Sequence, residues 1–365
     1  MRDDAPMTGQ EPRYSVVILT LDSHAAGPCE RAALRMAAEF PGLVIRVHAA
    51  AEWGESAEAL DAAKRDIATA DIVVSSLIFL EEHIKAILPD LQARRDHCDA
   101  MAGIIADAQI VKLTRMGTLD MAAPETATRK LLKKLRGSSA PSTESGERKM
   151  KMLKRLPRIL KLIPGKAQDL RAWFLIMQYW LGGSDDNIEG MVRFLISRYC
   201  RIAEWRGTRA PAPLEYPDTG LYHPDLPDRI TEDARALPGP ENATGTVGVL
   251  LMRSYVLSGD TAHYDAAIRA LEARGLRVLA AFASGLDGRP AIEAFFRDAA
   301  GVKIDALVSL TGFSLVGGPA YNDNEAAIGV LSALDVPYVA AHPLEFQTLG
   351  QWAASAQGLG PIETT

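Results

Sequence analysis

The sequence predicts an α/β protein with two flavodoxin-like parallel-sheet domains separated by a helical, basic neck. Three observations support this prediction. Short apolar, β-branched runs alternate with helical segments over residues 14–106, and the same rhythm returns from residue 246 onward. A stretch rich in lysine, arginine and proline separates the two regions. Strands that alternate with helices of this length imply right-handed crossovers and parallel sheets.

The first region contains four expected strands. The run YSVVILTL at residues 14–21 is apolar and β-branched, as expected for a strand buried on both faces. The helix that follows the second strand has Ser56 as its expected N-cap, and Pro89 is expected to bend the next one. The other expected strands are 43–48, 71–79 and 100–106, and the expected helices are 25–40, 56–70 and 81–99.

The middle region differs in charge and composition. Residues 129–166 hold thirteen Lys/Arg and two Glu, a local charge of 13 − 2 = +11, so the remainder carries −6 − 11 = −17. A basic helix at 128–135 precedes a Ser/Pro/Gly linker. Helical spacing is expected from residue 148 to 206, and the seven prolines of 211–240 predict an extended tether. Because the charged stretch lacks aromatic residues, it does not favour single-stranded nucleic acid binding; a partner or membrane surface and a solvated neck remain open.

The second α/β region predicts four more strands, which leave its sheet unfinished, so we expect the native chain to continue. The expected strands are 246–252, 276–282, 304–310 and 337–341, and the expected helices are 261–274, 289–300, 324–334 and 344–356. The expected domains are a head at 1–145, a helical neck with a Pro-rich tether at 146–240, and a second α/β domain at 241–365.

Composition indicates a soluble, cytoplasmic protein. Apolar residues make up 48% of the chain and charged residues 24%. Cys29, Cys98 and Cys200 are too few and too dispersed for a disulfide framework or a zinc site. The N-terminus lacks the apolar core of a secretory signal. The longest apolar run, 173–181, is about half of what spans a bilayer, so at most peripheral membrane contact is expected.

The most informative stretch is IDALVSLTGFSLVGGPA at residues 304–320, a strand that ends in a glycine-rich loop before a helix start at Asp323. In open α/β sheets, ligands bind where strands end. The spacing fits neither a P-loop nor G-x-G-x-x-G. A plain strand-to-helix connection remains the alternative. We predict a substrate-binding loop formed by Thr311, Gly312, Ser314, Gly317 and Gly318.

Two further residues are predicted at the same sheet edge. His342 ends the last strand, where an imidazole can exchange a proton near neutral pH; simple packing at a strand end is the alternative. Tyr255 follows strand 246–252, and a solvated loop is its alternative.

Metal and nucleophile motifs are missing from the sequence. The seven histidines form no HExxH or HxH pattern. Glu81-Glu82-His83 is interpreted as a helix start, and Ser184–Glu189 as a helix cap rather than a cation loop. No catalytic triad, Cys-His pair or nucleophile elbow is present, so we predict no resident metal site and assign no catalytic residue.

Several long segments resemble one family in order along the chain. They are YSVVILTLDSHAAGPCERA, LPRILKLIPGKAQDLRAWFLIMQYWLGGSDDNIEGMVRFLISRY, TGFSLVGGPA and VPYVAAHPLEFQT. Together they resemble the large subunits of magnesium chelatase, a family that includes the cobaltochelatase large subunit. The resemblance covers essentially the whole chain, which would be about the first third of such a subunit.

The resemblance implies a function in chlorophyll and bacteriochlorophyll biosynthesis. It implies binding of protoporphyrin IX and insertion of Mg²⁺ as the substrate metal. An AAA+ motor subunit that hydrolyses ATP and an adaptor subunit would be partners, and so would the methyltransferase that acts after the chelatase in this biosynthesis. The family's catalytic residues are expected beyond Thr365. Two alternatives remain open: a cobaltochelatase subunit acting on a corrinoid, and a non-catalytic partner-docking module. A stand-alone periplasmic-type sensor is disfavoured because a signal peptide is missing.

Overall fold

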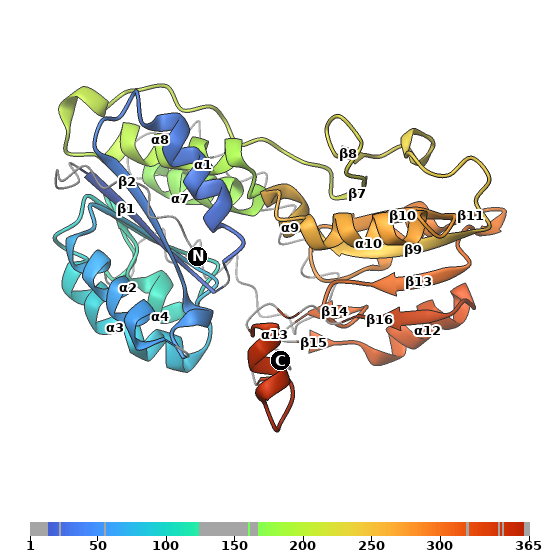
Figure 1. Ribbon diagram of the computed structural model, residues 1–365. Coiled ribbons are helices and arrows are strands. Elements are labelled where there is room, and N and C mark those ends of the chain that lie inside the picture. Colours follow the sequence, from blue (N-terminus) through green and yellow to red (C-terminus); the bar gives the residue numbers. More distant parts are fainter. Residues whose placement is uncertain are drawn as a thin grey trace. The chain divides into compact units, whose positions relative to one another are not determined.

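The computed structural model describes residues 14–21, 23–54, 56–123, 160, 167–318, 321–341, 344 and 347–360. They divide into two compact units, the first ending at Leu214 and the second beginning at Glu215. Each unit contains a six-stranded, mostly parallel sheet with helices on both faces (Figure 1). The predicted fold class, α/β with two flavodoxin-like sheets, is therefore confirmed.

The first sheet has a parallel core with a short antiparallel edge. Its strand order is β2-β1-β3-β4-β5-β6. Every residue of β1 is buried, which explains the uninterrupted apolar run in the sequence. The strands are β1 (Tyr14–Thr20), β2 (Leu43–Ala49), β3 (Ile72–Ser76), β4 (Ala100–Ile104), β5 (Arg115–Met116) and β6 (Leu119–Asp120).

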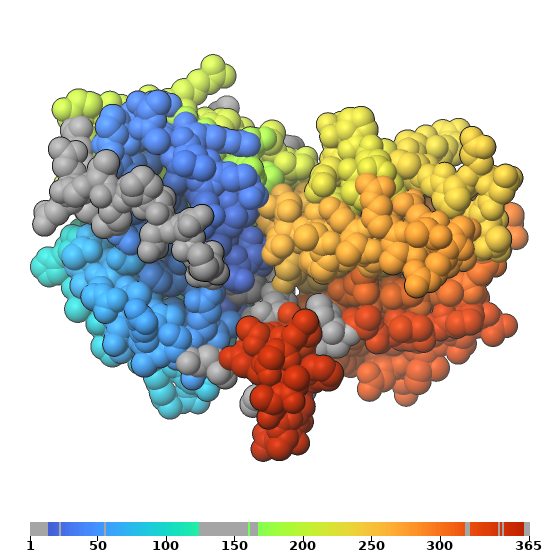
Figure 2. Space-filling model, in the orientation of Figure 1, coloured from blue at the N-terminus to red at the C-terminus, as the bar shows by residue number. Residues whose placement is uncertain are grey.

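Helices cover both faces of this sheet. One face packs against α1 (Ala26–Met36), α7 (Ala167–Gly182) and α8 (Asp185–Tyr199). The other packs against α2 (Ala57–Thr69), α3 (Glu81–Arg94) and α4 (Ala108–Lys112). Figure 2 shows the side chains of α1 in dark blue and those of α2 and α3 in lighter blue on the surface of this unit. Short 3-10 turns lie at η1 (Ala50–Glu52) and η2 (Ala203–Trp205). The predicted cap is present, since Ser56 accepts the N–H of Ala59 at 3.1 Å.

The helices that we expected in a neck are built into the first unit. Helix α7 is apolar on nearly all sides and lies in the same buried cluster as β1 and α1. Its Trp173 ring N–H donates to the carbonyl of Gly103 in β4 at 2.9 Å. On α8, Asp185 receives two hydrogen bonds from Arg31 of α1, at 2.7 and 2.8 Å. Of the basic segment at residues 129–166, only Leu160 is among the described residues.

The second sheet has the order β16-β13-β9-β10-β7-β8. Strands β16, β13, β9 and β10 run parallel, and β7 joins β10 antiparallel. Helices α9 and α10 pack on one face, and α11, η4 and α12 on the other. The strands are β7 (Thr219–Tyr222), β8 (Ile230–Thr231), β9 (Gly245–Met252), β10 (Leu276–Ala283), β13 (Ala306–Ser309) and β16 (Tyr338–Ala340). The helices are η3 (Ala234–Ala236), α9 (Arg253–Ser258), α10 (Ala262–Glu272), α11 (Arg289–Ala291), η4 (Ile292–Phe296), α12 (Asn324–Leu334) and α13 (Leu349–Ala354).

Two local expectations were wrong. The tether expected over 211–240 contains β7 and β8, because Tyr222 is fully buried and its hydroxyl bonds Thr261 at 2.9 Å. The helix expected over 289–300 ends at Phe296, and a hairpin of β11 (Arg297–Asp298) and β12 (Gly301–Val302) follows. Asp298 stabilises that turn by accepting the N–H of Ala300 at 2.8 Å.

Each sheet contains one topological switch point. In the first, the chain moves from β1 to β2 on one side and then to β3 on the other, so the reversal lies between β1 and β3. In the second, the same reversal lies between β9 and β13. Ligands of open α/β sheets bind at the carboxyl ends of such strands. Over the described ranges, the chain forms no helix with the length and apolarity needed to cross a membrane.

Candidate functional site

A crevice opens at the switch point of the second sheet, where the sequence predicted a ligand-facing loop. Residues from the ends of β9, β10 and β13 and from the loops after β10 and β13 line it. These residues are Leu250, Leu251, Met252, Ala283, Gly285, Leu286, Asp287, Gly288, Ser309, Thr311, Phe313, Ser314 and Leu315. Three segments far apart in the sequence thus meet at one sheet edge.

The hydroxyl groups of the predicted loop stabilise the loop itself. Thr311 Oγ1 lies 3.0 Å from Ser309 Oγ and accepts the N–H of Phe313 at 3.3 Å. Ser314 donates to the carbonyl of Val316 at 3.2 Å. Both hydroxyls therefore hold the backbone in a turn, and their remaining hydrogen-bonding capacity is what they offer to a ligand.

The glycines make this turn possible. Gly312 has φ +71° and Gly317 has φ +134°, conformations that side-chain-bearing residues rarely adopt. Gly317 and Gly318 form β14, which pairs with β15 (Tyr321–Asn322) in a small hairpin. The loop then leads into α12, whose predicted start at Asp323 is confirmed, and Asp323 caps the helix by accepting the N–H of Ala326 at 2.9 Å.

A second loop of the crevice escaped the sequence analysis. It follows β10 and contains Gly285, Asp287 and Gly288. The N–H of Gly288 donates to the carbonyl of Leu315 at 2.9 Å, which ties this loop to the predicted one. A Cβ at Gly288 would lie 3.3 Å from Leu250 and Leu315, so the approach is close. The same signal that identified residues 311–318, glycines directly after a buried strand, marks this loop in the sequence.

The crevice is narrow. Its enclosed volume is about 20 Å³, which is room for about one water molecule. A drug-sized ligand needs several hundred Å³. The crevice is thus suited to hold the edge of a larger molecule against exposed backbone. Its carboxylate, Asp287, is paired with Arg289 at 2.6 Å.

The structure brings together only some of the predicted site residues. Thr311 and Ser314 line the crevice, and Gly312, Gly317 and Gly318 shape its loop. Tyr255 packs on the opposite face of the sheet, where its ring lies edge-on to His263 with centroids 5.5 Å apart. His342 lies outside the described residues.

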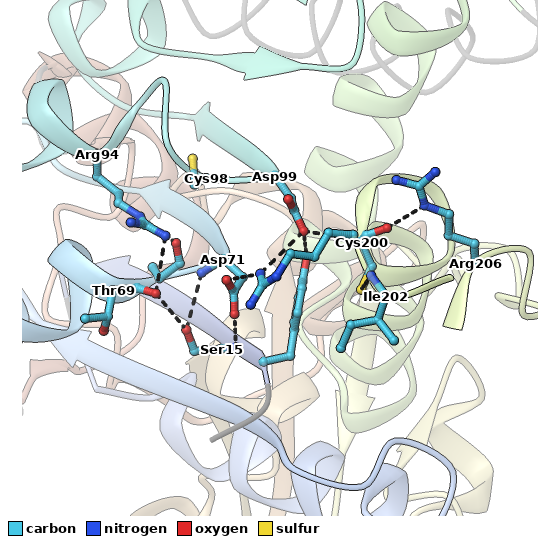
Figure 3. Close-up of polar contacts among 12 residues, drawn as sticks. Ser15, Thr69, Asp71, Arg94, Cys98, Asp99, Cys200, Ile202 and Arg206 are labelled. Carbon is cyan, nitrogen blue, oxygen red and sulfur yellow. Dashed lines mark hydrogen bonds and ion pairs between the residues drawn. The ribbon is translucent and has the colours of Figure 1, made fainter. Parts of the chain in front are cut away.

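A separate polar cluster lies at the amino edge of the first sheet (Figure 3). Asp71 accepts the backbone N–H of Ser15 at 2.7 Å and pairs with Arg201. Asp99 accepts from the Tyr14 hydroxyl and from the Arg201 backbone, both at 2.7 Å. These contacts join the starts of β1, β3 and β4 to the segment that follows α8.

This cluster stabilises the fold and shows no sign of chemistry. Burial, followed by the neighbouring Asp99, raises the pKa of Tyr14 far above its ordinary value. Burial also raises the pKa of the Cys200 thiol, so it is not an activated nucleophile. The amino edge is opposite to the edge where ligands of such sheets bind.

Metal-ligating clusters are not found in the described part of the chain, which shows no group of three or more His, Cys, Asp or Glu placed around a common point. His83 is buried near the start of α3, with its ring edge-on to Trp53 at 5.8 Å between centroids. Ser184 accepts the N–H of Asn187 at 3.3 Å, the capping contact predicted for residues 184–189.

Fold and crevice together define an α/β protein built from two doubly wound units, with a candidate ligand edge at the switch point of the second. A family model described as CobN/Magnesium Chelatase matches residues 177–365, just over half of the chain. Another, described as Domain of unknown function (DUF3479), matches residues 15–174. The chain therefore belongs to the CobN/magnesium chelatase family, which confirms the resemblance noted in the sequence.

Individual relatives are similar over most of this chain. The magnesium-chelatase H subunit of Cereibacter sphaeroides is 63% identical over 97% of the chain and 30% of the relative. That of Rhodobacter capsulatus is 60% identical over 96% and 29%. The chloroplastic magnesium-chelatase protein ChlH of Oryza sativa is 34% identical over 82% and 22%. The chain thus spans about 30% of the length of these two bacterial relatives.

The catalytic subunit of cobaltochelatase from Mycobacterium tuberculosis aligns with a TM-score of 0.48 and 16% identity, over 96% of this chain and 23% of that one.

Proposed function

We propose that this chain acts as the N-terminal part of the porphyrin-binding large subunit of a magnesium chelatase. The observation that supports this most strongly is the 63% identity to a magnesium-chelatase H subunit over 97% of the chain. In this proposal, the complete enzyme inserts Mg²⁺ into protoporphyrin IX for bacteriochlorophyll or chlorophyll synthesis. A motor subunit that hydrolyses ATP and an adaptor subunit act as partners. The free, buried cysteines Cys29, Cys98 and Cys200 are consistent with a cytoplasmic protein.

Within this function, the crevice of the second unit would form one wall of the tetrapyrrole site. A tetrapyrrole is flat and largely apolar, and it cannot enter an enclosed volume of about 20 Å³. Its edge can lie against the two loops of the crevice, at Thr311 and Ser314 in one and at Gly285 in the other, where no atom lies within 4 Å of the Cβ position. Because Tyr255 packs on the other sheet face, this wall does not depend on it.

Insertion of Mg²⁺ replaces two pyrrole protons, which require bases. Asp287, the carboxylate of the crevice, is held by Arg289. We therefore assign to this chain the positioning of the tetrapyrrole and no proton transfer. The bases would be carboxylates or imidazoles elsewhere in the enzyme.

A porphyrin titration of the 365-residue chain tests the proposal. Protoporphyrin IX should quench tryptophan emission saturably, and a corrinoid should not. Gly288→Val, which fills the close approach to Leu250 and Leu315, should weaken porphyrin binding at least tenfold. Gly239→Val is a suitable control, because the nearest atom to its Cβ is 3.9 Å away.

Unchanged porphyrin affinity in Gly288→Val would remove the crevice from the proposal. Preference for a corrinoid would favour the cobalt enzyme. Association with the motor and adaptor subunits without any tetrapyrrole affinity would favour a docking module.

A further inference from the structure

The carboxyl edge of the first sheet carries hydroxyl groups that the fold itself does not satisfy. Thr20 ends β1 and Ser76 ends β3, and both residues are fully buried. Neither Thr20 Oγ1 nor Ser76 Oγ has a hydrogen-bond partner. A buried hydroxyl without a partner destabilises a protein by a substantial amount, so a native fold that keeps two of them needs a reason.

The two hydroxyls are neighbours. Strands β1 and β3 are paired in parallel with Leu19 opposite Ser75, and Thr20 and Ser76 are each one residue further along. Side chains alternate between the faces of a strand. Val16 and Ile18 belong to the cluster with α1, so Thr20 and Ser76 lie on the α1 face too. This position is the switch point of the sheet.

The opposite face of the same edge is also incompletely satisfied. Ser75 Oγ and His83 Nδ1 are buried without a partner. Burial lowers the pKa of His83, so its imidazole is neutral near pH 7. The unsatisfied groups at the ends of β1 and β3 and at the start of α3 thus belong to one edge.

The backbone at this edge is strained. Leu77 has φ +58° and Ile105 has φ +43°, and the N–H of Leu77 donates to the carbonyl of Ile105 at 2.8 Å. Leucine and β-branched isoleucine rarely adopt this conformation. Such strain persists where the surrounding structure enforces it, and it clusters at binding sites.

The chemistry on the α1 face favours an anion. Helix α1 follows β1 directly, and it has Ala25 at the N-cap, no side-chain capping bond and no acidic residue in its first turn. The other long helices of the first sheet that follow a strand differ, since α2 is capped by Ser56 and α3 begins with Glu81 and Glu82. The N–H of Ala26 already donates to the Ser23 carbonyl at 2.9 Å and Pro28 has no N–H, so α1 contributes mainly its dipole, which attracts negative charge. The hydroxyl groups of Thr20 and Ser76 would donate to the oxyanion.

We propose that the switch point of the first sheet is a second binding site, in which Thr20 and Ser76 donate hydrogen bonds to a carboxylate or phosphate group of a small ligand. The ligand would enter at the carboxyl edge, between the loops that follow β1 and β3. Phe79, which is 53% exposed in the loop after β3, would contact its apolar part. This site is independent of the proposed tetrapyrrole wall in the second unit.

Stability and binding measurements on the full 365-residue chain test this site together. Without added anion, Thr20→Val should raise the melting temperature of the first unit by about 2–4 °C, because an unsatisfied hydroxyl is removed without loss of volume. Inorganic phosphate or acetate, titrated against chloride at constant ionic strength, should bind the wild-type chain. Binding should weaken at least tenfold in Thr20→Val and in Ser76→Ala. Thr20→Ser, which keeps the hydroxyl, should retain binding.

Thr114→Val is the matched control. Its hydroxyl is equally buried but satisfied, since it accepts the N–H of Gly103 at 3.0 Å and donates to the Gly103 carbonyl at 3.3 Å. This variant should lower the melting temperature. If Thr20→Val lowers it as well, the hydroxyl is satisfied by an internal water and the proposal is wrong. Equal anion affinity in the wild-type and Ser76→Ala chains would also overturn it. Binding of acetate alone would indicate a carboxylate ligand, and binding of phosphate a phosphorylated one.

Discussion

The parallel cores of the two sheets, β2-β1-β3-β4 and β10-β9-β13-β16, have the same strand order, but the two units differ at the edge where a ligand would bind. At the second switch point, Thr311 and Ser314 use their hydroxyls to hold their own loop. At the first switch point, the hydroxyls of Thr20 and Ser76 have no hydrogen-bond partner. A glycine-rich loop therefore identifies where the backbone turns tightly, whereas unsatisfied buried groups identify where a partner is missing. The glycine-rich loop, which is the clearer signal in the sequence, thus lies at the sheet edge where fewer buried polar groups lack a hydrogen-bond partner.

At the amino edge of each sheet, an aspartate that precedes one strand accepts a backbone N–H of the neighbouring strand. Asp71 precedes β3 and accepts the N–H of Ser15 in β1 at 2.7 Å. Asp305 precedes β13 and accepts the N–H of Thr246 in β9 at the same distance. Asp71 is buried and also pairs with Arg201, while Asp305 is exposed. The same contact should thus be worth more in the first unit.

Replacing these two aspartates should give the largest difference between the units. Asp71→Ala should destabilise the first unit by about 3 kcal/mol, because the buried N–H of Ser15 loses its acceptor and the half-exposed Arg201 loses a carboxylate partner. Asp305→Ala should destabilise the second unit by about 1 kcal/mol. Urea unfolding followed by tryptophan emission reports mainly the first unit, which holds Trp53, Trp173, Trp180 and Trp205, while the second unit holds Trp352. Circular dichroism reports both units. Equal losses in the two variants would contradict this account.

Acid should expose a second difference. Burial alone would raise the pKa of Asp169, but hydrogen bonds from Thr118, Arg198 and Tyr199 outweigh burial and hold that pKa below 3.8. A carboxylate with a lowered pKa stabilises the fold above its unfolded-state pKa, and this contribution is lost as pH falls through the folded value. The first unit should therefore lose stability below about pH 4.

Asp169→Asn tests this origin of the acid sensitivity. The variant should be less stable than the wild-type chain by about 2 kcal/mol at pH 7, and this difference should shrink as the pH falls below about 4 and the carboxylate of the wild-type chain is protonated. Urea midpoints measured across this pH range give the result. Asp225→Asn, which removes an exposed pair with Arg269, should leave the acid limb unchanged. A constant gap at all pH values would show that Asp169 acts only through hydrogen bonds.

The smallest effect should be a difference of sign between two threonines. Thr311→Val should destabilise the second unit by about 1 kcal/mol, because Phe313 loses the acceptor of its N–H. The corresponding replacement at Thr20 is expected to stabilise the first unit. Calorimetric melting of both variants measures the two signs. If both replacements change the stability in the same direction, the two switch points do not differ in the way described.

The strands were predictable because a strand buried on both faces consists of apolar, β-branched residues, as in residues 14–21. The caps at Ser56 and Asp323 were predictable from local chemistry. Strand β7 was not, because four residues among prolines become a strand only through pairing with β10. The apolar helix α7 indicated burial but not its partner sheet. Thr20 and Ser76 resemble ordinary strand residues, since a sequence pattern cannot show that a hydroxyl lacks a partner.

Helix α7 has a practical consequence for dividing the gene. The two family models meet at residues 174 and 177, in the middle of this helix. A cut there would separate Trp173 and Phe174 from Ile176 and Met177, all of which lie in one buried cluster. The severed half-helices would expose apolar surface and aggregate. A cut between Leu214 and Glu215 would instead separate the two compact units. The boundary between the two family models and the boundary between the two structural units therefore lie at different residues in this protein.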